Sequence, residues 1–414
     1  MLKSNKINYL AFNFCFISLT LSVASDLIVK GLPIKLFYIS SYISIIYAVF
    51  YFFKKREKVN FKNPAFYFII SILILGCSKA IWSIYFHTDV FHDIRENYYL
   101  GGKRFILSTF IAFYFYKNRL LLNNITLNVG LCIMIIGLLA SLFIAYQEHS
   151  QTGLRILLTA DSATTSAYLI VIISMVALVY IQHIVRETIW SLALFIVVFL
   201  ITMGMVIMTE TRAAILFTPL LYFLFFLLNF RHVNKKIMFA LTLIIIVTAA
   251  GTLSVTWERI EQIKTDIIAY HTNNDTSIGA RFSIWKSGLY HLDDNFLGQS
   301  VDQRYKNSED YINKYEGHNP EALRNVQYHL HNELIETLSL QGIIGFISLL
   351  FFYISGIIFA LCKSLTNSGN TLYVIIPVFV FGLTDVVLIQ SNTSMIICSA
   401  LALSLPISKK KQSY

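Results

Sequence analysis

The sequence predicts an all-α protein that crosses a membrane about twelve times, at roughly 20 apolar residues per crossing. Of its 414 residues, 56% are hydrophobic and only 14% charged, and the mean hydropathy is +0.63. A soluble domain carries about a quarter charged residues, so the apolar excess must face lipid. The apolar runs are continuous rather than alternating, which excludes a transmembrane β-barrel.

The apolar runs give the individual spans. They are predicted to begin near Ile7, Ile34, Pro64, Leu100, Ile125, Ala163, Thr188, Ala213, Ile237, Leu338, Leu372 and Thr393. The fourth and the last are the shortest. The first follows Lys3 and Lys6 but is longer than the apolar core of a signal peptide, about 7–15 residues, so we expect it to be retained.

The basic residues indicate the orientation. A net charge of +10 could indicate a nucleic-acid partner, but Lys and Arg are concentrated in alternate short connections and at both termini. The positive-inside rule then places both termini in the cytoplasm. The five cysteines lie in or beside apolar runs without metal-ligand spacing, so neither disulfides nor a zinc site are expected.

This orientation places residues 257–333, the longest polar stretch, outside the cytoplasm. We therefore expect three parts: spans one to nine in residues 1–256, the large loop in 257–333, and spans ten to twelve with a cytoplasmic tail in 334–414. The spacing of Phe282, Ile284, Trp285 and Leu289 is that of an amphipathic helix. The loop is expected to contain short helices folded onto the membrane surface.

Charged residues at the outer membrane face are the first candidates for function, because such residues are costly there. Arg212 follows Glu210 between the seventh and eighth spans, and Arg281 lies early in the loop. Two guanidinium groups can clamp a pyrophosphate bidentately. As alternatives, Arg212 pairs with Glu210 or snorkels, Arg281 is a solvated surface charge, and Lys79 in the third span snorkels.

A second candidate is the segment His329-Leu330-His331-Asn332, where the loop returns to the membrane. The two histidines could indicate a metal, but a spacing of two does not put them on one helical face, and HExxH is absent. An imidazole with a pKa of about 6.5 suits a general base. Because no phosphate-binding loop, GxGxxG or GxSxG is present, we expect no cofactor and no metal, and a substrate already activated in the membrane.

These segments resemble the bacterial O-antigen ligase family. The family pattern of His, then Asn, Ser or Gln, nine residues and Gly-x-x-Gly/Thr/Tyr is matched by His331-Asn332 and by Gly342-Ile343-Ile344-Gly345. Thr211-Arg212-Ala213, Gly279-Ala280-Arg281 and the stretch from Gly382 to Val386, which contains Asp385, also resemble family segments. The resemblance implies about twelve spans with cytoplasmic termini and a GT-C-like glycosyltransferase architecture.

The resemblance also implies an activity in lipopolysaccharide biosynthesis. An enzyme of this family transfers O-antigen polysaccharide from undecaprenyl pyrophosphate to a sugar hydroxyl of lipid A-core, without metal and with inversion, on the periplasmic side of the inner membrane. By this resemblance Arg212 and Arg281 would hold the pyrophosphate, and His331 would be the general base. Asn332 would orient His331 or the acceptor. Supporting roles would fall to Glu210, Lys79 and Asp385.

Two other functions stay open at this stage. An O-antigen polymerase shares the architecture and an Arg-bearing loop, although the pattern beginning at His331 favours the ligase. A flippase or transporter of lipid-linked glycans predicts mid-membrane charges and internal pseudo-symmetry. The charges here lie at the rim, and one asymmetric loop dominates the polar sequence.

Overall fold

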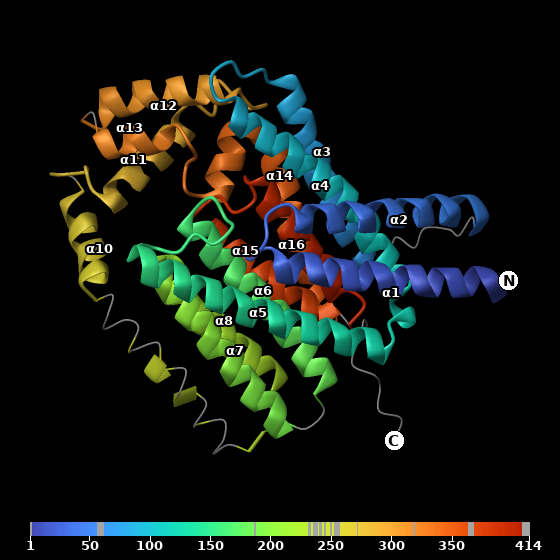
Figure 1. Ribbon diagram of the computed structural model, residues 1–414. Coiled ribbons are helices and arrows are strands. Elements are labelled where there is room, and N and C mark those ends of the chain that lie inside the picture. Colours follow the sequence, from blue (N-terminus) through green and yellow to red (C-terminus); the bar gives the residue numbers. More distant parts are fainter. Residues whose placement is uncertain are drawn as a thin grey trace.

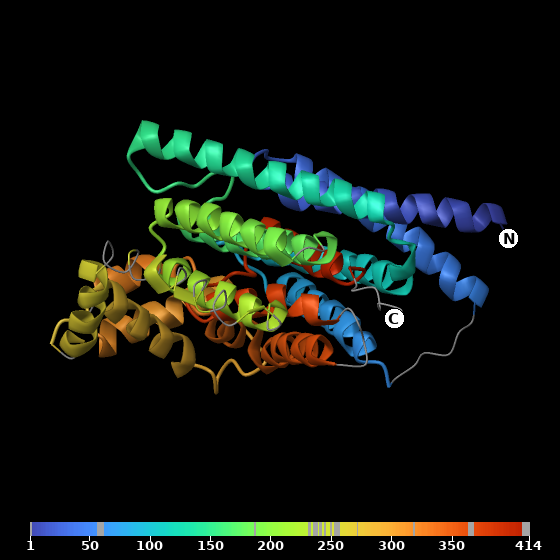
Figure 2. The same cartoon turned by 90° about the horizontal axis from the view of Figure 1, so that it is seen from below.

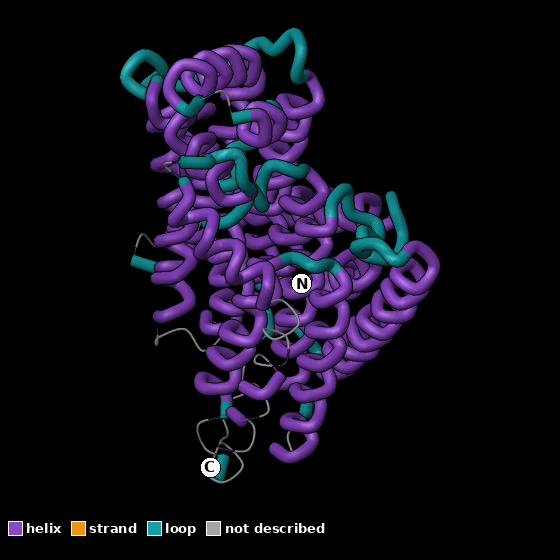
Figure 3. The backbone as a smooth tube through the Cα atoms, turned by 90° about the vertical axis from the view of Figure 1, so that its left-hand side faces the viewer, coloured by secondary structure: helices purple, strands orange, loops and turns teal. Residues whose placement is uncertain are grey.

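The protein is helical in every part of the chain that the computed structural model describes, and these parts contain no strand (Figures 1 and 3). The described residues are 2–407 without 56–61, 186–187, 231–232, 235–238, 240–241, 244–245, 249–250, 252–256, 271, 318 and 363–367. The helices of the bundle are α1 Leu2–Ser25, α2 Leu32–Lys55, α3 Pro64–Tyr85, α4 His92–Lys117, α5 Asn124–Thr152, α6 Ala163–Ile184, α7 Thr188–Met208, α8 Arg212–Asn229, α14 Glu333–Leu361, α15 Leu372–Gly382 and α16 Ser391–Ser404, with 3₁₀ turns at Arg119–Leu121 and Ser368–Thr371.

Eight of the described helices are long and apolar enough to cross a membrane: α1, α2, α3, α5, α6, α7, α8 and α14. The 26-residue α4 carries several charges, and α15 and α16 have 11 and 14 residues. The span expected from Ile237 falls largely outside the described residues. A polytopic helical membrane protein is thus confirmed, while the count of about twelve spans stays a prediction.

Helix α6 is the centre of the bundle. In its most apolar window 89% of the residues are buried, the largest share of any candidate span. It contacts α5, α7, α8, α15 and α16. A helix that is apolar on all sides can be enclosed in this way, because it has no polar face that must reach water.

The loop segment forms four short helices: α10 Trp257–Ala269, α11 Ser277–Tyr290, α12 Val301–Tyr315 and α13 Pro320–Val326. Figures 1 and 2 place them together at the end of the bundle away from the start of α1. Three of them, α11, α12 and α13, share a small core of Ala280, Ile284, Ile312, Ala322, Val326 and Leu330. The expected apolar face of α11 is partly wrong, because Leu289 is 41% exposed and small residues form much of the buried face.

The motif glycine Gly342 makes a kink inside α14, with φ 63° and ψ −160°. A Cβ atom built there would lie 2.3 Å from the Phe296 carbonyl oxygen and 2.5 Å from the Gly298 nitrogen. The freed backbone groups pair with the loop: Ile343 N–H donates to Phe296 O at 3.0 Å, and Gln299 N–H donates to Leu340 O at 2.9 Å. Only glycine allows this pairing, which attaches the loop to the bundle.

We expect Gly342→Ala to lower the thermal stability of the purified protein. The backbone conformation of Gly342 is nearly restricted to glycine, so a residue with a side chain would destabilise the fold by about 1–3 kcal/mol there. The overlap of the added Cβ with the loop increases this loss of stability. Gly153→Ala is the control for a left-handed backbone alone, because Gly153 has φ 63° and ψ 7° with no atom within 4 Å of an added Cβ. Intrinsic fluorescence gives the melting temperature of each variant. Equal decreases for the two variants would exclude the loop contact as the cause of the Gly342→Ala destabilisation.

Candidate functional site

The chain makes a tight turn between α13 and α14, and the two histidines lie in it. His331 has φ 51°, a left-handed conformation that is uncommon for a residue with a side chain. The turn brings the rings of His329 and His331 to a centroid distance of 4.3 Å at 74°. The two-residue spacing separates side chains on a helix, but the segment is a turn and the side chains meet.

Asp385 completes a cluster with these histidines, from the connection between α15 and α16. Its Oδ1 lies 3.7 Å from Nε2 of His329 and 3.5 Å from Nδ1 of His331. Burial alone would raise the pKa of Asp385, but the two imidazoles and the Val386 N–H outweigh it and hold the pKa well below its usual range. Burial lowers the pKa of His329 to about 4, so this ring is neutral near pH 7.

Asn332 is the N-cap of α14. Its Oδ1 accepts hydrogen bonds from Leu334 N–H at 3.0 Å and Ile335 N–H at 3.1 Å. Its Nδ2 donates to Leu383 O at 3.1 Å, in the segment that carries Asp385. The side chain thus holds the two halves of the cluster together, and its predicted role in substrate binding stays a prediction.

Lys79 and Glu333 form a buried pair behind the cluster. Nζ of Lys79 lies 4.0 Å from Oε1 of Glu333 and donates to Leu388 O at 2.7 Å. Oε2 of Glu333 accepts from Leu388 N–H at 2.8 Å. Both side chains are almost completely buried, so Lys79 does not snorkel. Its contacts indicate that it holds the 385–390 segment against α14, and its predicted role in phosphate binding stays a prediction.

Arg304 of α12 and Glu336 of α14 form a second buried pair, at 2.8 Å. The same carboxylate oxygen of Glu336 accepts from Leu330 N–H at 2.8 Å, between the two histidines. Glu336 follows His331 closely in the sequence, whereas Arg304 carried no signal. Nothing in its local sequence distinguishes a buried arginine on α12 from a solvated one.

Arg281 lies in the second turn of α11 and is half-buried. Tyr168 of α6 lies close enough to Arg281 to experience its charge, and it also lies near the side chains of Thr384 and Asp385. Tyr168 carried no sequence signal, because a tyrosine in an apolar span is usually part of the core. Arg281 is thus in the same part of the molecule as the histidine–aspartate cluster.

Arg212 begins α8, and the preceding Glu210 has φ 51°. Thr211 Oγ1 donates to Ala163 O, the start of α6, at 3.3 Å. Arg155, which the sequence did not single out, donates to Thr209 O at 2.8 Å and to Thr211 Oγ1 at 3.3 Å. Arg212 is thus at the same end of α6 as Tyr168, and the pairing of Arg212 with Arg281 around one pyrophosphate stays a prediction.

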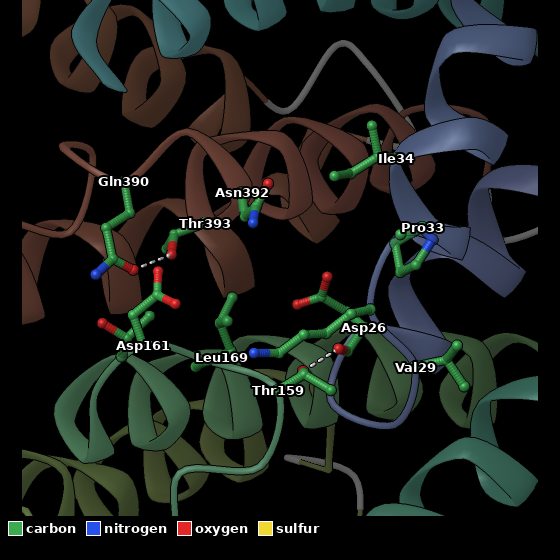
Figure 4. Close-up of a pocket in the computed structure, with 14 residues that line it drawn as sticks. Asp26, Val29, Pro33, Ile34, Thr159, Asp161, Leu169, Gln390, Asn392 and Thr393 are labelled. Carbon is green, nitrogen blue, oxygen red and sulfur yellow. Dashed lines mark hydrogen bonds between the residues drawn. The ribbon is translucent and has the colours of Figure 1, made fainter. Parts of the chain in front are cut away.

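A polar cavity of about 200 Å³ opens beside this end of α6 (Figure 4). Carboxylate, amide and hydroxyl groups line much of it, from Asp26, Thr159, Asp161, Gln390, Asn392 and Thr393. Burial raises the pKa of Asp26 to about 7, against the opposing charge of Arg104. Arg104 donates to Asn392 Oδ1 at 2.9 Å. Such a set of donors and acceptors matches the hydroxyl groups of a sugar.

A second cavity, of about 370 Å³, lies where α3 and α14 meet the loop. Its lining is largely apolar and includes Ile81, Trp82, Phe86, Leu297 and Ile344. Trp82 donates its indole N–H to Gln299 O at 3.0 Å, which keeps the ring in place. An apolar chain fits this lining.

Fold and site together define a polytopic helical membrane protein with a His–His–Asp cluster between a loop subdomain and its bundle. Residues 197–350 match the family model described as O-antigen ligase, a range that includes Arg212, Arg281 and His331. Over 420 aligned residues the chain is 25% identical to the O-antigen ligase of Escherichia coli strain K12. This alignment covers 99% of this chain and 96% of that protein. The resemblance to the bacterial O-antigen ligase family is therefore confirmed, by the family model over residues 197–350 and by this relative over nearly the whole chain.

We expect Glu336→Gln to destabilise the protein strongly, because the neutral amide leaves the buried Arg304 guanidinium without a counter-charge. Breaking a buried ion pair from one side costs about 3–5 kcal/mol. Adding Arg304→Met should recover part of that loss, and denaturant or thermal unfolding of the two single variants and the double variant measures the coupling. Additive effects of the two substitutions would show that the pair is not coupled.

Proposed function

We propose that the protein is an O-antigen ligase, a glycosyltransferase that moves O-antigen polysaccharide from undecaprenyl pyrophosphate to a sugar hydroxyl of lipid A-core. One observation carries the proposal: the family-motif histidine, His331, has its Nδ1 3.5 Å from the buried carboxylate of Asp385. A base oriented by a carboxylate is the arrangement needed to take a proton from a hydroxyl.

The tautomer follows from the position of Asp385. The Nδ1 proton of His331 is directed at the carboxylate, so Nε2 carries the lone pair that faces the acceptor. Nε2 takes the acceptor hydroxyl proton as the oxygen forms its bond to the anomeric carbon of the donor. The bond from that carbon to the pyrophosphate breaks, and its electron pair leaves with undecaprenyl pyrophosphate. Displacement in one step inverts the anomeric configuration.

The leaving group is the second requirement. Pyrophosphate gains negative charge as it departs, and fixed guanidinium groups stabilise that charge best in a site with little water. Arg281 lies in the same part of the molecule as the cluster, and Arg212 begins α8 beside the start of α6. We assign the pyrophosphate to these two arginines, with Glu210 fixing Arg212. No metal enters the scheme.

The cavities suggest where the rest of each substrate lies. We assign a sugar unit to the polar cavity lined by Asp26, Asp161 and Asn392, and a lipid chain to the apolar cavity beside Trp82. The loop helices lie at the end of the bundle away from the start of α1. This position of the loop helices and the positive-inside rule together support an inner-membrane protein whose site faces the periplasm. On this proposal residues 257–333 form the periplasmic loop, and the spans lie in residues 1–256 and 334–414.

The function and the base are tested together with His331→Gln, introduced into a strain that lacks the chromosomal copy. We expect bare lipid A-core and polymerised O-antigen accumulating on undecaprenyl pyrophosphate, since loss of a base lowers the rate roughly 10²–10⁴-fold. The control is His291→Gln, because His291 lies 3.6 Å from the exposed Asp294 in a similar pair on the loop surface.

Gel separation of lipopolysaccharide and analysis of the lipid-linked pool give the answer. Core carrying single repeat units would indicate a polymerase instead. Full-length capped lipopolysaccharide in the strain without any copy would overturn both functions.

Arg281→Lys is expected to reduce the ligation rate although the charge is kept. A lysine cannot form the bidentate contact, and the loss of one charge-assisted hydrogen bond of about 1.5–3 kcal/mol corresponds to roughly 10- to 100-fold. Arg324→Lys is the control, because Arg324 is on the same loop subdomain with its side chain 70% exposed. Reconstituted ligation with purified donor and acceptor gives the rates, and an unchanged Arg281→Lys rate would remove Arg281 from the pyrophosphate site.

A further inference from the structure

The cluster of His329, His331 and Asp385 offers three donor atoms that could hold a transition-metal ion. One nitrogen from each histidine and one carboxylate oxygen all lie within 4.8 Å of one another. Zinc bound tetrahedrally by nitrogen and oxygen at about 2.0–2.2 Å holds neighbouring donors roughly 3.3 Å apart. The two nitrogen–oxygen distances, 3.5 and 3.7 Å, are within about half an ångström of that spacing.

A second observation points to the same position. Nδ1 of His331 is buried and has no hydrogen-bond partner within the described part of the chain. A buried nitrogen is normally satisfied, and this one faces the Asp385 carboxylate at 3.5 Å, which is long for a hydrogen bond, so an ion between the two groups could replace that contact. Two imidazoles and a carboxylate are a set that zinc prefers, and three protein ligands leave its fourth position open.

The protein can accommodate the ion with small changes. A metal bound to Nε2 of His329 would place the ring proton of His329 on Nδ1. The hydrogen bond from the backbone N–H of His331 to this Nδ1 would then be lost, but at 3.3 Å it is a long one. The side chains of His329 and His331 are 23% and 22% exposed, so the cluster can be reached from outside. Asn332 and Glu336 hold the two segments in place independently of the ion.

We infer that zinc, or a divalent ion of similar chemistry, binds His329, His331 and Asp385 and reversibly switches off the site; this rests on the proposed function. A neutral imidazole has one lone pair. When Nδ1 of His331 gives that pair to the metal, the ring proton lies on Nε2, which then cannot accept the proton of the acceptor hydroxyl. The same nitrogen therefore either points its proton at Asp385 in the active state or binds the ion in the inactive state.

Binding is measured first, on the full-length protein in lipid nanodiscs after treatment with a chelator. We expect one Zn²⁺ per chain by equilibrium dialysis, and visible absorption of tetrahedral Co²⁺ as the spectroscopic probe. His329→Gln should weaken binding at least about 100-fold, since even outer partners of a metal ligand contribute roughly 10–100-fold. His291→Gln, which alters the surface histidine beside Asp294, should leave binding unchanged.

Ligation is measured second, as the ratio of rates without and with Zn²⁺ for each variant, so that differences in basal rate cancel. For the wild type this ratio should rise over the same Zn²⁺ concentrations that displace Co²⁺, and for His329→Gln it should stay near one.

Two outcomes overturn the inference and leave the ligase proposal standing. In the first, the metal-free wild type ligates but binds no ion. In the second, His329→Gln binds the ion as tightly as the wild type does. Ligation that is lost on chelation and restored by Zn²⁺ also overturns the inhibitory role. Metal-free protein that binds the ion yet never ligates overturns the proposed function instead.

Discussion

The arrangement of the site depends on two buried carboxylates in the first turn of α14, Glu333 and Glu336, which need hydrogen-bond partners from other segments. Glu333 accepts a hydrogen bond from Leu388 N–H, and Glu336 accepts from Leu330 N–H and from Arg304. Carboxylates are favoured at a helix N-terminus, but buried ones still require such partners. In meeting that requirement the helix fixes the segments that carry His331 and Asp385, one on each side of its N-terminus.

The kink at Gly342 makes the same helix into the anchor of the loop. Because α14 is interrupted there, its backbone can exchange hydrogen bonds with residues 296–299, and the loop helices are held by main-chain contacts rather than by side chains alone. The nine residues between Asn332 and Gly342 then correspond to the distance between cap and kink. The family motif therefore combines a proposed base, a helix cap and an anchor for the loop.

The cluster also explains why one histidine can serve two states. Asp385 and His329 approach His331 from different segments, so the environment of its Nδ1 depends on what occupies the space among the three side chains. In the proposed ligation mechanism the carboxylate orients a base when the space is free. In the proposed metal-bound state the same side chains become ligands and the base is lost.

The sequence by itself determined the parts that depend on local composition: the apolar spans, the polar loop with its short helices, and the motif residues Arg212, Arg281, His331 and Asn332 as candidates. Apolar runs and helix signals act over a few residues, and the lipid selects them directly. Only the tertiary structure decided that Asp385 meets His331, that Arg304 is a buried partner of Glu336, and that Lys79 is directed inward. These contacts join residues far apart in the chain, and they arise because packed helices must pair every buried charge.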